Sequence, residues 1–400
     1  MHPEINNFSK YLNKTALIIA AEKNHFEVVQ QLLGCKGIEF GEFGLSGFPI
    51  TELNIPYYLV SIDSNAFAKC TLLQKIILPS SVKIIGNNVF FGCESLTTVS
   101  LPTSLESIGE SAFEGCVSLE ELILPESLNS IGKNAFKKCA KLKEISVPKS
   151  VKLIAEGTFE ECKSLERVKL GYLIEVIAFS AFKDCCSLKQ VALPAFLTTI
   201  GSYVFYNCSS LITITIPKKV TVIESYVFKG CKSLLMVSLP DSIKEIKDHA
   251  FCECSSLGDV KIPESVTSIG SSTFGGCKKL KKVEMPSSVS SIGDNAFENC
   301  VALADIAIPS SLETVKEYTF TGCSSLEHVS FPYSVKAIEK GAFEGCTKLK
   351  KVDIPFSVKR IGDYCFSGCE SLAYTYISSA VSVGKGIFDG SPANSDKKYI

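Results

Sequence analysis

The chain has 400 residues, with 41 Lys and Arg, 42 Asp and Glu, 4 His and no Trp. This near-neutral balance lacks the basic surface that attracts nucleic acids, so we expect no nucleic-acid partner. The opening MHPEINNFSK has no basic start followed by an apolar region, as a secretory signal would, and the apolar run Ala16–Ala21 is too short to span a membrane.

Residues 1–46 differ in pattern from everything that follows. Within them, NKTALIIAAEKNHFEVVQQLLGCKGIEF (Asn13–Phe40) contains two apolar stretches of helical character. This stretch resembles one ankyrin repeat, although Ala16 and Ile18 stand where that family has Pro and His. A single unit has too little core to be stable alone. Two interpretations are open, an ankyrin-type binding module or a short helical N-terminal cap on the array behind it, and the need to cover an apolar end favours the cap.

From residue 47 to residue 390 the chain keeps one strict period, which equals the spacing from Cys116 to Cys139. Fourteen ladder cysteines mark it without an insertion or deletion: Cys70, Cys93, Cys116, Cys139, Cys162, Cys185, Cys208, Cys231, Cys254, Cys277, Cys300, Cys323, Cys346 and Cys369. Phe stands three residues before each and Leu three residues after, and Pro follows nine residues after the cysteines up to Pro355, except at Gly171. A period of this length with one apolar stretch per repeat is typical of a leucine-rich solenoid.

The expected fold is therefore an α/β-type repeat solenoid, a leucine-rich repeat array of 23-residue coils with a parallel strand face. In each coil a segment such as Leu119–Pro125 predicts a strand whose side chains at plus six and plus eight, here Leu122 and Leu124, point inward. The Pro ends that strand because it has no N–H to donate. The return path holds a Gly that suits a turn, and it could be a second short strand, a helical turn or irregular backbone.

The repeat C-x-x-L-x-x-I-x-L-P-x-S-L/V-x-x-I-G-x-x-A-F-x-x-C resembles the BspA-like leucine-rich repeat over residues 47–390. That resemblance implies a non-enzymatic array that binds proteins, from a family of surface and secreted adhesins and antigens, with no catalytic residues, cofactor or small-molecule substrate. It also implies a cell-surface or secreted location, with a cytoplasmic location as the alternative because no signal peptide is visible. The last coil departs from the repeat, and residues 391–400 are expected to form a loose tail.

The cysteines have several possible roles, of which packing is favoured. Disulfide frameworks belong to short chains with poor cores, and zinc sites need paired ligands that the closest cysteine sets do not offer. A nucleophilic cysteine needs a nearby base, but the four histidines are scattered. One cysteine per coil is instead explained as a small buried residue with a weak S–H donor beside the Phe, and the stacked Phe rings are interpreted as core. We therefore expect no metal site and no catalytic centre.

Binding is expected in the columns that vary, which on the strand face are four, five and seven residues after the ladder cysteine. The first coils place charged and apolar residues there, such as Glu120, Glu121 and Ile123. The middle coils place uncharged residues there, and aromatic residues replace polar ones on the edge loops. The candidate protein-binding residues are Ile212, Thr213, Thr215, Leu235, Met236, Ser238, Tyr172 and Phe196. Single exposed apolar residues are common on any surface, and the edge aromatics could instead pack on a neighbouring coil.

Two functions are compatible with the sequence. One is a binding solenoid on the cell surface or secreted, which contacts host proteins or proteins of neighbouring cells. The other is an intracellular protein-interaction scaffold, which the ankyrin-like start, the missing signal and the cysteine-rich core favour.

Overall fold

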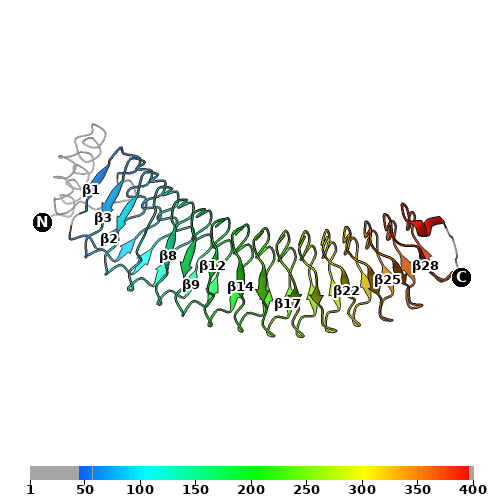
Figure 1. Cartoon of the computed structure of the whole chain (residues 1–400). Helices are drawn as coiled ribbons and strands as arrows, with labels where there is room; N and C mark the ends of the chain where they lie inside the picture. Colours follow the sequence, from blue (N-terminus) through cyan, green and yellow to red (C-terminus); the bar gives the residue numbers. More distant parts are fainter. Residues whose placement is uncertain (1–44, 56, 396–400) are drawn as a thin grey trace, which may run out of the picture. The chain divides into compact units, whose positions relative to one another are not determined.

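The computed structural model describes residues 45–55 and 57–395. The chain divides into two compact units, unit 1 ending at Pro194 and unit 2 beginning at Ala195. Within each unit, the repeated coils follow one another in sequence order (Figure 1). The ankyrin-like repeat and the helical cap predicted for residues 1–46 lie outside the described residues, except for the last two positions.

In most coils of unit 1 a strand of two or three residues, here called the longer strand, follows the leucine, and a two-residue strand lies on the return path. The longer strands are β1 (Glu52–Asn54), β3 (Lys75–Ile77), β5 (Thr98–Ser100), β8 (Glu144–Ser146), β10 (Arg167–Lys169) and β12 (Gln190–Val191). The short strands are β2 (Ser61–Ile62), β4 (Ile84–Ile85), β6 (Ser107–Ile108), β7 (Ser130–Ile131), β9 (Leu153–Ile154) and β11 (Val176–Ile177). Equivalent strands pair in parallel at the period of the sequence, as in the register Ile76↔Val99.

Unit 2 repeats the same plan. Its longer strands are β14 (Thr213–Thr215), β16 (Met236–Ser238), β18 (Val260–Lys261), β20 (Val283–Glu284), β22 (Asp305–Ala307), β24 (His328–Ser330), β26 (Lys351–Asp353) and β28 (Tyr374–Tyr376). Its short strands are β13 (Thr199–Ile200), β15 (Val222–Ile223), β17 (Glu245–Ile246), β19 (Ser268–Ile269), β21 (Ser291–Ile292), β23 (Thr314–Val315), β25 (Ala337–Ile338), β27 (Arg360–Ile361) and β29 (Ser382–Val383).

The return path settles the question that the sequence leaves open, because it carries the short strand followed by turns. The prediction of a parallel strand face is confirmed, whereas the α/β label is wrong for the described residues. Among them the one helical segment is the 3₁₀ helix η1 (Pro392–Ser395). The coil is therefore a β-solenoid coil: a two-residue strand and a chain of tight turns are enough to bring the backbone back to the next leucine.

The interior of each unit is built around the predicted Phe ladder. In unit 1 the rings from Phe67 to Phe182 stack with centroids 5.1–5.6 Å apart and interplanar angles of 8–22°. In unit 2 the rings from Phe205 to Phe388 continue the same stacking, at 5.2–5.9 Å. These distances fall in the favourable range for offset aromatic pairs, and the ladder rings up to Phe366 are fully buried. The interpretation of the ladder as core is confirmed.

The ladder cysteines pack beside those rings and also link successive coils. The thiol of Cys116 donates a hydrogen bond to the carbonyl oxygen of Phe90 at 3.2 Å, and that of Cys139 donates to Phe113 at the same distance. The same bond recurs along both units at 3.1–3.3 Å. Every ladder cysteine is a buried thiol. The packing role is confirmed, and a hydrogen bond to the preceding coil explains why Cys, rather than Ala, is used.

The serine that follows the proline has a related task. The hydroxyls of Ser81, Ser104 and Ser127 donate to carbonyl oxygens of the preceding coil at 2.5, 2.8 and 2.6 Å. Each hydroxyl therefore satisfies a backbone carbonyl that lies outside the hydrogen-bonded strands. The repeat uses small donors, a thiol on one side and a hydroxyl on the other, to join coils that have few strand residues.

The last coil is shorter than its neighbours by one position. Tyr376 is in register with Asp353, a full period before it, but Val383 is in register with Ile361, one position less than a full period away. A strict period would align Gly384 with the inward Ile361 of the previous coil, but the structure aligns Val383 with it. Residues 391–395 begin the segment expected as a tail, and there the amide of Ala393 donates to the Leu372 carbonyl at 3.0 Å. Residues 396–400 lie outside the described part.

Candidate protein-binding surface

The strand face of each unit, defined here as the outer side of the longer strands, alternates as the sequence predicts. In β8, β10 and β16 the first and third residues are exposed and the second is buried. Residues five and seven after the ladder cysteine therefore point outward, and residue six points into the core. The scaffold is uniform beneath this face, whereas the exposed residues differ from coil to coil.

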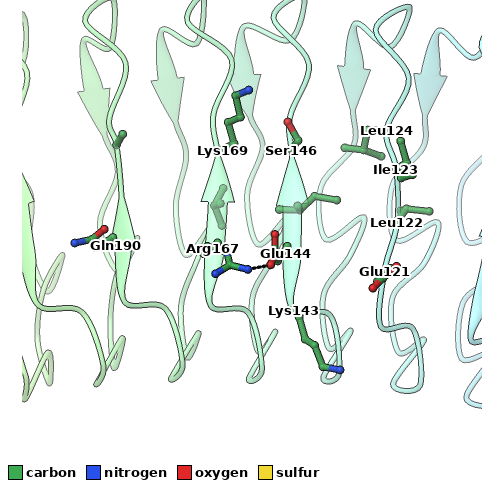
Figure 2. A pocket seen from close by; sticks show the side chains of 13 residues that line it. Glu121, Leu122, Ile123, Leu124, Lys143, Glu144, Ser146, Arg167, Lys169 and Gln190 are labelled. Carbon is green, nitrogen blue, oxygen red and sulfur yellow. Dashed lines mark hydrogen bonds and ion pairs between the residues drawn. The ribbon is translucent and has the colours of Figure 1, made fainter.

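On the strand face of unit 1 lies an open groove of about 740 Å³, here called the strand-face groove. Four consecutive coils line it, with Glu121, Leu122, Ile123, Leu124, Lys143, Glu144, Ile145, Ser146, Arg167, Val168, Lys169, Gln190 and Ala192. In Figure 2, Glu121, Glu144 and Arg167 lie toward one end of the strands, and Ile123, Ser146 and Lys169 toward the other. At the coil of Glu121 the ladder of longer strands is reduced to one bridge, Glu121↔Glu144.

Ion pairs between neighbouring coils neutralise much of the charge in and around the groove. Lys143 lies 2.9 Å from Glu120, Lys189 lies 2.8 Å from Glu166, and Arg167 pairs with Glu144. The hydrogen bond from Lys143 lowers the pKa of the Glu120 carboxyl, and the same bond raises the pKa of the Lys143 ammonium. Exposed pairs of this kind stabilise a fold only weakly, because solvent screens them, so their main effect here is on the surface charge pattern.

Two charged side chains of the groove stand outside these ion pairs, and one large apolar side chain is highly exposed. Among the described residues, neither Glu121 nor Lys169 has an ion-pair partner, and Ile123 is 86% exposed. The sequence pattern singled out Glu121 and Ile123 but missed Lys169. Its position in the repeat could have identified it, because Lys169 stands seven residues after its ladder cysteine, as Ile123 does, and that column is outward-facing.

The candidate residues of the middle coils form a second surface, on the strand face of unit 2. The parallel register places Thr213 beside Met236 and Thr215 beside Ser238. Ile212, Leu235 and Met236, here called the apolar patch, are 38%, 53% and 58% exposed. The amide of Leu235 donates to the Ile212 carbonyl at 2.8 Å, so these two positions are direct neighbours.

The two edge aromatics of the candidate set belong to neither surface. Tyr172, in unit 1, is 58% exposed beside Gly171, where a Cβ atom would lie 2.4 Å from the Pro148 carbonyl oxygen. That close approach explains why the repeat loses its proline in this coil. Phe196, in unit 2, is half-exposed, and the Lys219 ammonium lies 4.7 Å from the centre of its ring. The structure therefore places the strand-face candidates beside one another on neighbouring coils, whereas Tyr172 and Phe196 lie apart from them on edge loops.

Groups capable of chemistry are dispersed over the described residues. No three His, Cys, Asp or Glu side chains among them converge as a metal site would require. His249 stacks on the Tyr226 ring at 4.6 Å, and burial lowers the pKa of its imidazole. Burial also raises the pKa of the ladder thiols, to about 12 for Cys323 and Cys369, which disfavours the nucleophilic thiolate. In the part of the chain that is described, no helix has the length and apolar character needed to cross a membrane.

Known proteins agree with this architecture. The BspA type leucine rich repeat region matches the chain over residues 38–166, 129–258 and 244–373, whereas no curated protein matches it. A leucine-rich repeat protein from Bacteroides ovatus is 28% identical, with a TM-score of 0.63 over 83% of this chain and 88% of its own. A leucine rich cell surface protein from Faecalibacterium prausnitzii is 27% identical, with a TM-score of 0.50 over 84% of this chain and 87% of its own.

The matched repeats span most of the chain and coincide with the coils that carry the Phe and Cys ladders. The chain therefore belongs to the BspA type leucine rich repeat family.

Proposed function

We propose that this protein is a non-enzymatic binding solenoid that holds a protein partner on its strand face, as a cell-surface or secreted adhesin or antigen does. The observation that carries this proposal is the contrast between a repeated interior and a varied exterior. The same Phe, Cys and Leu recur beneath every coil, while the exposed columns change from charged to apolar. A scaffold that repeats and a surface that does not are what recognition of one partner requires.

The apolar patch is the contact that we propose for unit 2. Leu235 directly precedes β16 and Met236 begins it; both are more than half exposed, and Thr213 and Ser238 surround them with hydroxyls. Protein interfaces combine an apolar centre with a polar rim in this way, and a few such side chains carry most of the binding free energy. Met is also well suited to contact surfaces, because its side chain is flexible and polarisable.

The combined variant Ile212→Ala, Leu235→Ala and Met236→Ala tests this contact. Immobilised full-length protein would be incubated with proteins extracted from cell surfaces, and the retained proteins quantified by mass spectrometry. We expect the variant to retain a specific partner at least about tenfold less than the wild type, with an unchanged circular dichroism spectrum. A matched control, Ile84→Ala with Leu153→Ala, removes apolar side chains that are 47% and 46% exposed on short strands, and it should retain the partner. Equal retention by all three proteins would contradict the placement.

The surface location is supported by the Faecalibacterium relative, which is described as a cell surface protein. An intracellular interaction scaffold is the second candidate, because the cysteines that the structure describes are all thiols, as in a reducing compartment. Labelling intact cells with an amine reagent that does not cross membranes separates the two. A surface protein would be labelled on its exposed lysines, whereas an internal scaffold would be labelled only after lysis.

A further inference from the structure

The strand-face groove contains two charged residues of opposite sign, Glu121 and Lys169, that make no ion pair with another described residue. Glu121 lies next to Glu144 in the parallel bridge, but Glu144 is already paired with Arg167 on its other side. Lys169 has Ser146 as its neighbour in the preceding coil of the same column. The groove therefore has an acidic position and a basic position, and neither makes an ion pair with another described residue.

Ile145 and Ser146 lie directly between these two charges, and the Glu144–Arg167 ion pair flanks them. Ile145 lies buried in the floor of the groove between the two charged coils, and Ser146 is exposed above it. Ile123 projects from the coil of Glu121 and is 86% exposed. An occupant of the groove would meet an acid, then an apolar and hydroxyl-bearing stretch, then a base (Figure 2).

The spacing of the charges restricts what that occupant can be. Glu121 and Lys169 are separated by two coils, roughly 10 Å along the stack, and by two residues along the strand, roughly 7 Å, which together give about 12 Å. In an extended peptide, side chains four residues apart point to the same side and are separated by roughly 13 Å. The residue midway between them also points to that side, where it would meet the apolar floor.

From this match we infer that the strand-face groove binds an extended protein segment with a basic residue, an apolar residue two positions away and an acidic residue two positions further. The basic side chain pairs with Glu121, the acidic side chain pairs with Lys169, and the apolar one lies over Ile145 beside Ile123. Because the side-chain spacing is the same for either chain direction, segments with the order basic, apolar, acidic and segments with the reverse order both fit, so the groove selects charge content and spacing. This inference rests on the protein-binding role proposed above and adds the chemistry of the partner.

Three end-capped, fluorescein-labelled peptides test the inference by fluorescence anisotropy with the full-length protein at low salt. Their cores are Lys-Thr-Leu-Thr-Glu, Lys-Thr-Leu-Thr-Lys and Glu-Thr-Leu-Thr-Glu. The wild type should bind the first about fivefold more tightly than either of the others, since each like-charged peptide loses one exposed ion pair and gains one repulsion. Failure of the first peptide to bind at concentrations up to about 5 mM, where even a weak complex would form, would overturn the inference.

Charge reversals make the test independent of absolute affinity. Glu121→Lys should make the peptide with two Glu the tightest ligand, and Lys169→Glu should do the same for the peptide with two Lys. The matched controls Glu126→Lys and Lys149→Glu make the same charge changes on exposed residues outside the groove, and they should keep the wild-type order. A groove variant that folds and keeps the wild-type order would overturn the inference. The proposed function would still stand if the apolar patch variant lost its partner, so the two failures are distinguishable.

Discussion

At the scale of single residues, the structural role was predictable for positions that hold the same residue in every repeat. The ladder cysteines, phenylalanines and leucines belong to the core on spacing alone, and they are buried in the structure. What spacing could not supply was the hydrogen-bond partner, such as the Phe113 carbonyl that accepts from Cys139, because the partner lies on a different coil. The same limit applies to the site. Glu121 and Ile123 stand out as variable residues, but the unmatched charge of Lys169 depends on knowing which neighbours are already paired.

Glu160 shows how a contact between coils controls the response to pH. Glu160 is largely buried, and its carboxylate oxygens lie 2.8 Å from the Lys183 ammonium and 3.0 Å from the Lys137 ammonium. Burial opposes ionisation of Glu160, but the hydrogen bonds from Lys183 and Lys137 outweigh it and hold the pKa of this carboxyl below its usual range. The folded pKa lies below the unfolded value of about 4.3, so the stabilisation is complete above that pH and is lost as the pH falls through the folded pKa.

Replacement Glu160→Gln should therefore lower the free energy of unfolding by about 1 kcal/mol near neutral pH, and by progressively less below about pH 4. Urea titrations of both proteins at several pH values would measure the difference. Glu126→Gln serves as the control, because Glu126 is exposed and should give a small, constant difference. A Glu160→Gln deficit that stays the same at acidic pH would show that the carboxylate charge is not the source of the stabilisation.

At the scale of elements, the longer strand was predictable and the return path was not. Alternating apolar residues before a proline specify a strand with a definite inner side, as Leu122 and Leu124 do. The two-residue strands of the return path are too short for any periodicity to appear in the sequence. They exist because parallel neighbours complete their hydrogen bonds, as β6 does for β7. Such a strand forms only when neighbouring coils are stacked, so the sequence of one coil does not predict it.

The glycine that ends many short strands is needed for the close approach of neighbouring coils. A Cβ atom on Gly132 would lie 2.5 Å from the backbone nitrogen of Glu110, while the Gly132 amide donates to Ile108 at 2.8 Å. Gly132→Ala should therefore push the ends of β6 and β7 apart and destabilise the protein by about 1–3 kcal/mol, measured by urea or thermal unfolding. Gly258→Ala is the matched control, because the nearest atom to its Cβ would be 3.7 Å away. Equal effects of the two substitutions would refute the steric explanation.

At the scale of the whole molecule, the repeat period determines which residues occupy equivalent positions in successive coils. Equivalent residues lie side by side, so the period also predicts most contacts between coils. Once β8 is known to pair with β10 of the next coil, the pairing Glu144–Arg167 follows from the columns. The sequence could not show where a continuous surface becomes a groove, because that depends on side-chain shape over four coils. Phe388, one residue early in the sequence, indicates a shortened last coil, but only the structure shows that the position is lost between β28 and β29.

The same equivalence predicts how the thiols of the full-length protein react. The 18 cysteines of the chain include 17 that the structure describes. All ladder members are buried, and burial raises the pKa of Cys116 and Cys162, whereas Cys186 is half-buried. Because maleimide reacts with accessible thiolates, a short pulse on the native protein should modify Cys186 at least about tenfold faster than Cys116 or Cys162. Peptide mass spectrometry would measure each site, and the same pulse in urea should modify all 18. Rapid native modification of the ladder would mean that coils open locally, since no ladder thiol of a closed stack is accessible.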